Sequence, residues 1–219
     1  MRFWVELKYL LIKEFWIEWK QKFTIQSLIL YAFSMTFVAS IAFKGKIPLH
    51  AWNALFWILE LFLAINAVAK SFGGEQDGQS LWMYSISGPS AVIFSKIIYN
   101  VFFLSLLSLI TVLFFGLLST FPVQNPLEFL GIVLLGSFGL ANSLTIISAI
   151  AAQARNKSVL LALLSFPVIL PQLLTLMRLS KRAIEGLEAA SMQDYWFLFG
   201  LDGILLVLSA LLFPFLWRE

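Results

Sequence analysis

Six long apolar runs dominate the chain of 219 residues. A helix rises about 1.5 Å per residue, so about 20 apolar residues cross a hydrocarbon core of about 30 Å. Each run comes close to this length or exceeds it, and the pattern predicts an all-α membrane protein with six transmembrane helices. The predicted spans cover residues 24–43, 51–69, 91–118, 129–154, 158–177 and 195–217.

Residues 1–23 precede this six-span domain, residues 24–219, and have a different pattern. At 100° per residue, charged side chains such as Arg2 and Lys13 fall on a narrow stripe, whereas Trp4 and Phe15 fall on a broad apolar face. Such a pattern is typical of an amphipathic helix that lies in the membrane interface. The alternative is a helix that packs against the bundle and leaves a few charges solvated.

Composition supports the bilayer as the solvent of this chain. Hydrophobic residues make up 60% of it and charged residues 12%, whereas a soluble domain is about 25% charged. The net charge of +3 comes without a basic run, so nucleic acid is not expected as a partner. The absence of cysteine excludes disulfides and thiolate chemistry in this chain.

Lysine and arginine predict the orientation, because cytoplasmic segments are enriched in both. With the N-terminus inside, ten of the 15 Lys and Arg residues lie on the inner side and five on the outer side. We therefore expect both termini in the cytoplasm. Residues 178–194 then lie outside, and their mixed charges suggest a short helix on the outer surface.

Motifs for catalysis are missing from the sequence. It has no G-x-x-x-x-G-K-[ST] loop, no Gly-rich dinucleotide fingerprint and no H-E-x-x-H pair. We assign no catalytic and no metal-binding residue. If the protein does energised work, a partner must hydrolyse the ATP.

The stretch between the second and third spans is the most informative on the inner side. Residues 73–74 are Gly-Gly and end the preceding helix, and Asp77 can cap a new short one. Residues 88–89 are Gly-Pro and separate it from the third span. The segment could dock into a groove on another protein, or lie in the interface with its aromatic rings among the headgroups. Its apolar surface comprises Leu81, Trp82, Met83, Tyr84 and Ile86.

Two segments together resemble the haem exporter protein B family (CcmB) of bacterial cytochrome c maturation. The first is the Asp77-Gly78 turn with the short apolar helix, Pro89 and the following A-V-I-F-S-K. The second runs from Leu134 to Leu174, where L-L-G-S-F-G-L-A-N-S-L leads through I-A-A-Q-A-R-N-K to V-L-L-A-L-L-S-F-P-V-I-L-P. Length, six spans and the amphipathic start agree as well, so the resemblance covers nearly the whole chain.

The resemblance implies an ABC-2-type permease subunit in the bacterial cytoplasmic membrane. A separate CcmA-like ATP-binding subunit would act on the short cytoplasmic coupling helix, and the complex would export haem or release a haem-loaded carrier. Haem-handling CcmC-like and CcmD-like subunits and a second copy of this chain are the other expected partners. No cofactor is expected to be firmly bound by this chain, although haem can be present in the complex. The expected ATPase-coupling residues are Glu75, Asp77, Gly78, Leu81, Trp82, Tyr84 and Pro89.

Alternatives to this function are a permease for another substrate and a membrane scaffold that transports nothing. Among the intramembrane polar residues, Glu60 needs a partner, which could be Asn66, a neighbouring span or a subunit interface. A transport role for Glu60 is the less common alternative. Asp202 is expected to reach Arg178 or Arg182.

Three further features concern the shape of the bundle and its ligands. Pro167 and Pro171 form either a hinge or a fixed kink in the fifth span. His50, at the outer edge of the second span, is expected to be solvated, with haem ligation as the alternative. Small residues crowd the fourth span, which favours close helix packing or, alternatively, a homodimer seam. They are Gly131, Gly136, Ser137, Gly139, Ala141 and Ser143.

Overall fold

The computed structural model describes residues 2–20, 22–68, 88–152, 157–186 and 192–216. Every regular element within these ranges is a helix. The elements are α1 (Arg2–Lys20), α2 (Lys22–Ala42), α3 (Leu49–Val68), α5 (Pro89–Leu118), α6 (Pro126–Ala152), α7 (Lys157–Glu185) and α8 (Met192–Leu216).

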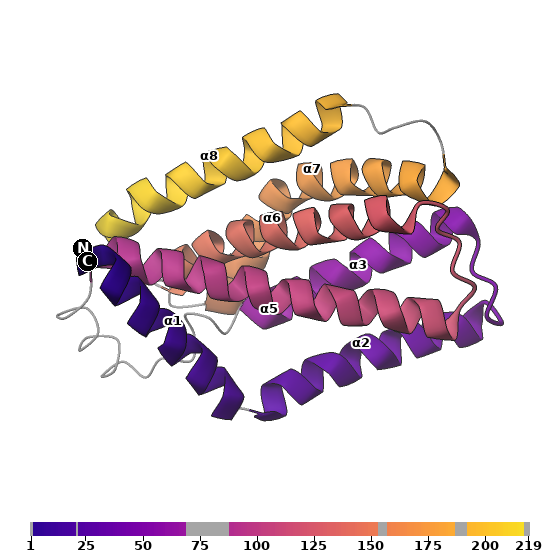
Figure 1. The fold of residues 1–219 in the computed structure, drawn as a ribbon, viewed down its shortest axis with the longest axis horizontal. Helices are drawn as coiled ribbons and strands as arrows, with labels where there is room; N and C mark the ends of the chain where they lie inside the picture. Colours follow the sequence, from indigo (N-terminus) through magenta and orange to yellow (C-terminus); the bar gives the residue numbers. More distant parts are fainter. Residues whose placement is uncertain (1, 21, 69–87, 153–156, 187–191, 217–219) are drawn as a thin grey trace.

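Six of the described helices are long and apolar enough to cross a membrane, namely α2, α3, α5, α6, α7 and α8. This confirms the all-α membrane fold that the apolar runs predict. Figure 1 shows the six running beside one another, with α1 oblique to them and both chain termini at the same end of the bundle. The end that carries the termini is also the end at which α5 starts, and α3 runs toward it from the opposite end.

The opposite end of the bundle is tied together by its connections. The turn between α2 and α3 places Lys44 and Gly45 at positive φ, 53° and 75°, where glycine carries no steric penalty. The Gly45 carbonyl accepts a hydrogen bond from the Thr120 amide at 3.1 Å, and Trp52 Nε1 donates to Ser119 Oγ at 3.2 Å. These bonds join the α2–α3 turn and the start of α3 to the segment that follows α5.

The helix α7 is longer than the sequence pattern suggests. Residues 178–194 were expected to form a separate surface helix, but α7 continues without interruption to Glu185, so that prediction is wrong. The reason is that Leu179 and Ala183 are fully buried and extend the packed face of the helix beyond residue 177, where the predicted span ended. Gly186 follows with φ 64°, the left-handed conformation that commonly ends helices.

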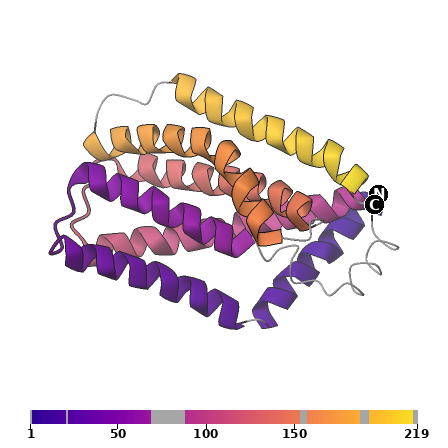
Figure 2. The same ribbon diagram turned by 180° about the vertical axis from the view of Figure 1, so that it is seen from behind.

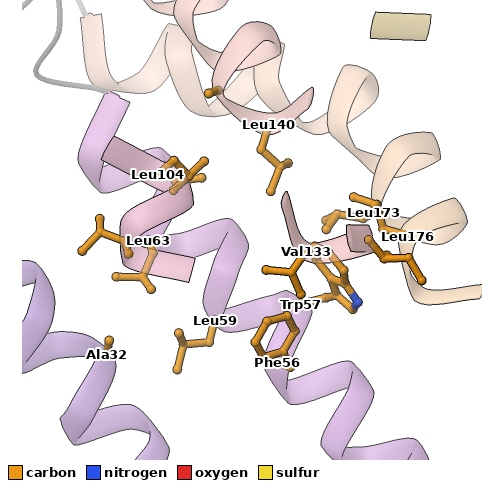
Figure 3. Packing of buried hydrophobic residues seen from close by; sticks show 14 of the residues in the cluster. Ala32, Phe56, Trp57, Leu59, Leu63, Leu104, Val133, Leu140, Leu173 and Leu176 are labelled. Carbon is orange, nitrogen blue, oxygen red and sulfur yellow. The ribbon is translucent and has the colours of Figure 1, made fainter. Parts of the chain in front are cut away.

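The main core lies where α3, α6 and α7 meet. Figure 3 shows Phe56 and Trp57 of α3 beside Val133 of α6 and Leu176 of α7. Trp57 is 1% exposed, and its indole nitrogen donates to Ser180 Oγ at 2.8 Å. The single polar group of the buried Trp57 side chain thus has a hydrogen-bond partner, as buried tryptophan usually does.

The small residues of α6 make this packing possible. A Cβ at Gly136 would lie 2.6 Å from Trp57 Cη2, and Ser137, Gly139, Ala141 and Ser143 are buried as well. Only small side chains let helices approach this closely. Close packing within the chain is therefore confirmed for these residues, whereas Gly131 is exposed and the homodimer seam stays a prediction.

We predict that Gly136→Ala destabilises the bundle, because the added methyl group must displace the Trp57 ring. Overpacking of this kind costs about 1–3 kcal/mol. Gly131→Ala is the matched control, since a Cβ there meets nothing within 4 Å on the same helix. Thermal unfolding in one detergent measures both variants. Equal melting temperatures for the two would show that the ring moves without cost.

Candidate functional site

The segment expected to meet an ATPase joins the bundle at the start of α5. Residues 69–87 lie outside the described residues, and with them Glu75, Asp77, Gly78, Leu81, Trp82 and Tyr84. Pro89 is described and is the first residue of α5, where its missing N–H costs no helical hydrogen bond. Gly88 precedes it in an extended conformation as the N-cap. Residues 69–87 therefore precede α5 in the chain with only Gly88 between them.

The helix α1 is attached at this same point. Glu6 Oε2 accepts a hydrogen bond from the Gly88 amide at 3.1 Å. A carboxylate at this position also compensates the partial positive charge at the N-terminus of the 30-residue helix α5. Gly88, the first described residue after this segment, is thereby held to α1 as well as to α5.

A buried ion pair joins the two helices further along. Lys96 Nζ lies 3.4 Å from Glu14 Oε1, and the lysine side chain is 2% exposed. A buried ammonium is costly unless a carboxylate compensates it, so the pair fixes the register of α1 on α5. The ring of Phe15 packs edge-on against the rings of Tyr99 and Phe102, with 5.2 Å between ring centroids in each case. Sequence reasoning missed this pair, although a lysine within an apolar run was its signal.

These contacts show how α1 is placed. Leu7 and Leu10 are buried, whereas Trp4, Tyr9 and Trp16 are 60–71% exposed. The helix therefore packs against the bundle, as the alternative interpretation held. It also turns an aromatic face outward, which is the side available to the membrane interface. Whether that face lies in the interface stays a prediction.

Four helices converge on this end of the bundle. One apolar cluster contains Leu10 of α1, Ile93 and Ile97 of α5, Ala149 of α6 and Phe213 of α8. Of these helices, α5 has the widest set of neighbours, because it packs against α1, α2, α3, α6 and α8. With 30 residues it is about 45 Å long. The start of α5 is thus the point from which one helix reaches most of the bundle.

Glu60 lies deep among α3, α5 and α6. Its side chain is 1% exposed and accepts a hydrogen bond from Ser108 Oγ at 2.6 Å, and Ser137 Oγ lies 2.9 Å from Ser108 Oγ. The expectation of a partner in a neighbouring span is therefore confirmed. Asn66 is not that partner, because its amide donates to the Phe62 carbonyl of its own helix.

Asp202 joins α8 to α6 and α7. Gln172 Nε2 donates to Asp202 Oδ1 at 3.2 Å, and Asn142 Nδ2 donates to the Asp202 carbonyl at 3.1 Å. The predicted pairing with Arg178 or Arg182 is wrong, since both guanidinium groups lie 3.9 Å from Asp194 instead. Asp194 stands in the first turn of α8, level with the end of α7, whereas Asp202 lies about 12 Å deeper along the helix.

Comparison with known protein families identifies the family of this chain. The model of the family described as CcmB protein matches residues 6–217, nearly the whole chain. The chain belongs to the CcmB family. No curated protein matches it, and no solved structure matches it.

Family membership establishes the coarse function. This CcmB-family chain is a multi-pass membrane component of an ABC-type haem export system of cytochrome c biogenesis, a system that includes an ATPase. The family match covers both stretches from which the resemblance was first inferred. The roles of individual residues, the ligand and the orientation of the termini stay predictions.

The two intramembrane prolines of the CcmB-family chain shape α7. Figure 2 shows a pronounced bend in this helix, which contains Pro167 and Pro171. The Pro171 carbonyl accepts a hydrogen bond from Thr175 Oγ1 at 2.9 Å. The kink is therefore present, and whether it acts as a hinge stays a prediction. His50 is exposed in the first turn of α3, and the described residues contain no group of three potential metal ligands.

We predict that Glu14→Gln loosens α1 from α5, because it leaves the Lys96 ammonium buried beside a neutral amide. Breaking a buried pair in this way costs about 3–5 kcal/mol. Lys13→Gln is the control, since Lys13 lies 3.8 Å from the same carboxylate but is 34% exposed, and an exposed pair contributes at most about 1 kcal/mol. Thermal unfolding of the two variants should separate them clearly. Equal, small losses would show that the Glu14–Lys96 pair does not fix α1.

Proposed function

We propose that this chain couples ATP hydrolysis by a separate CcmA-like subunit to the membrane bundle through residues 75–89. The coupled work is haem export or the release of a haem-loaded carrier outside the cytoplasmic membrane. The observation that carries the proposal is the direct continuation of this segment into α5, which packs against five other helices.

The residue composition of α5 favours a straight helix that can transmit a displacement along its length. Its only proline is Pro89 at the first position, and its only glycine is Gly116 near the far end. The helix between them lacks the residues that usually cause kinks. A push on residues 75–89 would therefore move α5 as a rod. Because Glu6 holds Gly88 and Glu14 pairs with Lys96, α1 would move with it.

The same proposal includes the partners and the orientation. Both termini and residues 69–87 are placed on the cytoplasmic side, and CcmC-like and CcmD-like subunits and a second copy of this chain complete the complex. A permease for another substrate is the first alternative, and purification of the complex intact without any haem-handling subunit would favour it. A scaffold that transports nothing is the second.

We predict that Leu81→Asp and Trp82→Asp abolish the response of the partner ATPase to this chain, because each places a charge on the apolar surface expected to dock. The measurement is the ATP hydrolysis rate of the reconstituted complex beside that of the ATPase alone. Leu127→Asp, at the opposite end of the bundle and 85% exposed, makes the same chemical change and should leave the response intact. An unaltered rate in the Leu81 and Trp82 variants, with the complex assembled, would favour the scaffold.

The orientation can be tested in the same cysteine-free chain. Ser80→Cys lies in the coupling segment, and Thr120→Cys lies in the exposed connection after α5. We predict that a membrane-impermeant maleimide labels Thr120→Cys in intact spheroplasts and labels Ser80→Cys only after permeabilisation. The reverse pattern would place residues 75–89 on the side that a cytoplasmic ATPase cannot reach.

A further inference from the structure

A hydrogen-bonded junction lies near the middle of the membrane where α6, α7 and α8 meet. Asp202 is ten residues from the start of α8, which is about 15 Å along the helix and half of a hydrocarbon core. Its side chain accepts a hydrogen bond from Gln172, and Ser143 Oγ donates to Gln172 Oε1 at 3.3 Å. The family assignment gives this junction no role.

Two buried oxygen atoms at this junction accept no hydrogen bond from a described residue. They are Asp202 Oδ2 and Asn142 Oδ1. Asp202 is 2% exposed and Asn142 is 0% exposed. Because each orphaned oxygen in this environment costs free energy, the site lacks a donor.

The carboxyl group is directed at the backbone of α6. A Cβ at Gly139 would lie 2.7 Å from Asp202 Oδ1, 2.9 Å from Asp202 Oδ2 and 1.7 Å from Gln172 Nε2. Glycine at this position therefore leaves room for the carboxyl group and the amide together. Asn142 stands on the same helix and already donates its amide N–H to the Asp202 carbonyl.

The charged side chains that the structure describes on the surrounding helices have partners other than Asp202 or lie far from it. On α7, Arg178 and Arg182 lie next to Asp194, and Lys181 lies 3.8 Å from Glu185. On α5, Lys96 pairs with Glu14. The acid of α6, Glu128, stands in its first turn at the far end, and Glu60 of α3 is bound by Ser108. Among the residues that the structure describes, an ionised Asp202 would thus face amides and hydroxyls at membrane depth without a compensating cation, which is costly.

We propose that Asp202 is a proton-binding site within the membrane and is a neutral carboxylic acid in this conformation. A proton on Oδ2 supplies the missing donor, and Asn142 Oδ1 is the acceptor that lacks one. The acid then connects α8 to α6 through Asn142 and to α7 through Gln172. Gln172 follows Pro171 directly, and its amide N–H can donate to Oδ1 whether or not Oδ2 carries the proton, so the proton itself acts on the connection between α8 and α6. This site stands on its own contacts and does not depend on the proposed ATPase coupling.

Infrared spectroscopy of the full chain in lipid nanodiscs at neutral pH tests the proposal directly. The chain has aspartate only at positions 77, 194 and 202, so isotope-labelled aspartate marks three groups. We expect an aspartate-derived carbonyl band of a protonated acid that shifts in heavy water. Asp202→Asn should remove it, and Asp194→Asn should leave it, since Asp194 lies beside two arginines. If labelling shifts only carboxylate bands, Asp202 is ionised and the proposal is wrong.

Thermal stability supplies a second, independent readout. Asn at position 202 keeps the shape of the neutral acid and offers an N–H in place of the O–H, so Asp202→Asn should melt close to the wild type. Asp202→Leu removes every polar contact of the side chain and should melt well below it. If sodium raises the melting temperature of the wild type but not of Asp202→Asn, the site binds a metal cation, and a proton site is excluded.

Discussion

Lipid offers no hydrogen bonds, so every polar group that this chain carries into the hydrocarbon must find its partner inside the protein. Apolar side chains do not specify which helices meet, because lipid tails suit them as well as a neighbouring helix does. Polar side chains do specify it. Glu60 accepts from Ser108 between α3 and α5, and Asn100 donates to Thr145 between α5 and α6 at 2.9 Å. The arrangement of the bundle depends on these pairs.

Most of these junctions include α6, the most buried of the six spans, with 72% of its apolar window inside the protein. From one end to the other, α6 contributes Ser137 to the Glu60 site, Asn142 and Ser143 to the Asp202 site, and Ser148 to the Val68 carbonyl of α3. Small residues occupy the positions between them, so neighbouring helices come close enough for short hydrogen bonds. Close packing and polar pairing are therefore two consequences of one sequence pattern.

Local signals in the sequence predicted the local features. The length of the apolar runs gave six spans, and two prolines four residues apart gave the bend in α7. Features that depend on the register between helices could not be predicted. Asp202 was expected to pair with arginine because reach along one helix can be estimated from the sequence, whereas the approach of Gln172 from another helix cannot. The extension of α7 to Glu185 likewise required knowledge of what Leu179 packs against.

The candidate coupling site shows the same limit. The resemblance identified residues 75–89 from sequence alone, and the family match covers them. The attachment of α1 to that segment was not predictable, since Glu6 and Gly88 are 82 residues apart and only the fold brings them together. A glutamate on a short amphipathic helix is ordinarily a solvated charge. Here the fold places it at the N-terminus of α5.

Stiff and bent helices are separated in this bundle, and the separation has a mechanical consequence. Neither α5 nor α6 has a proline beyond its first residue, and the two helices pack against each other, with Asn100 bound to Thr145 between them. The prolines within described helices lie in α7 and near the end of α8. A displacement that enters at Pro89 would pass along stiff helices and be absorbed where α7 bends. Gln172 donates to Asp202 Oδ1 one residue beyond Pro171, so α8 is attached to α7 at the place where that displacement would arrive.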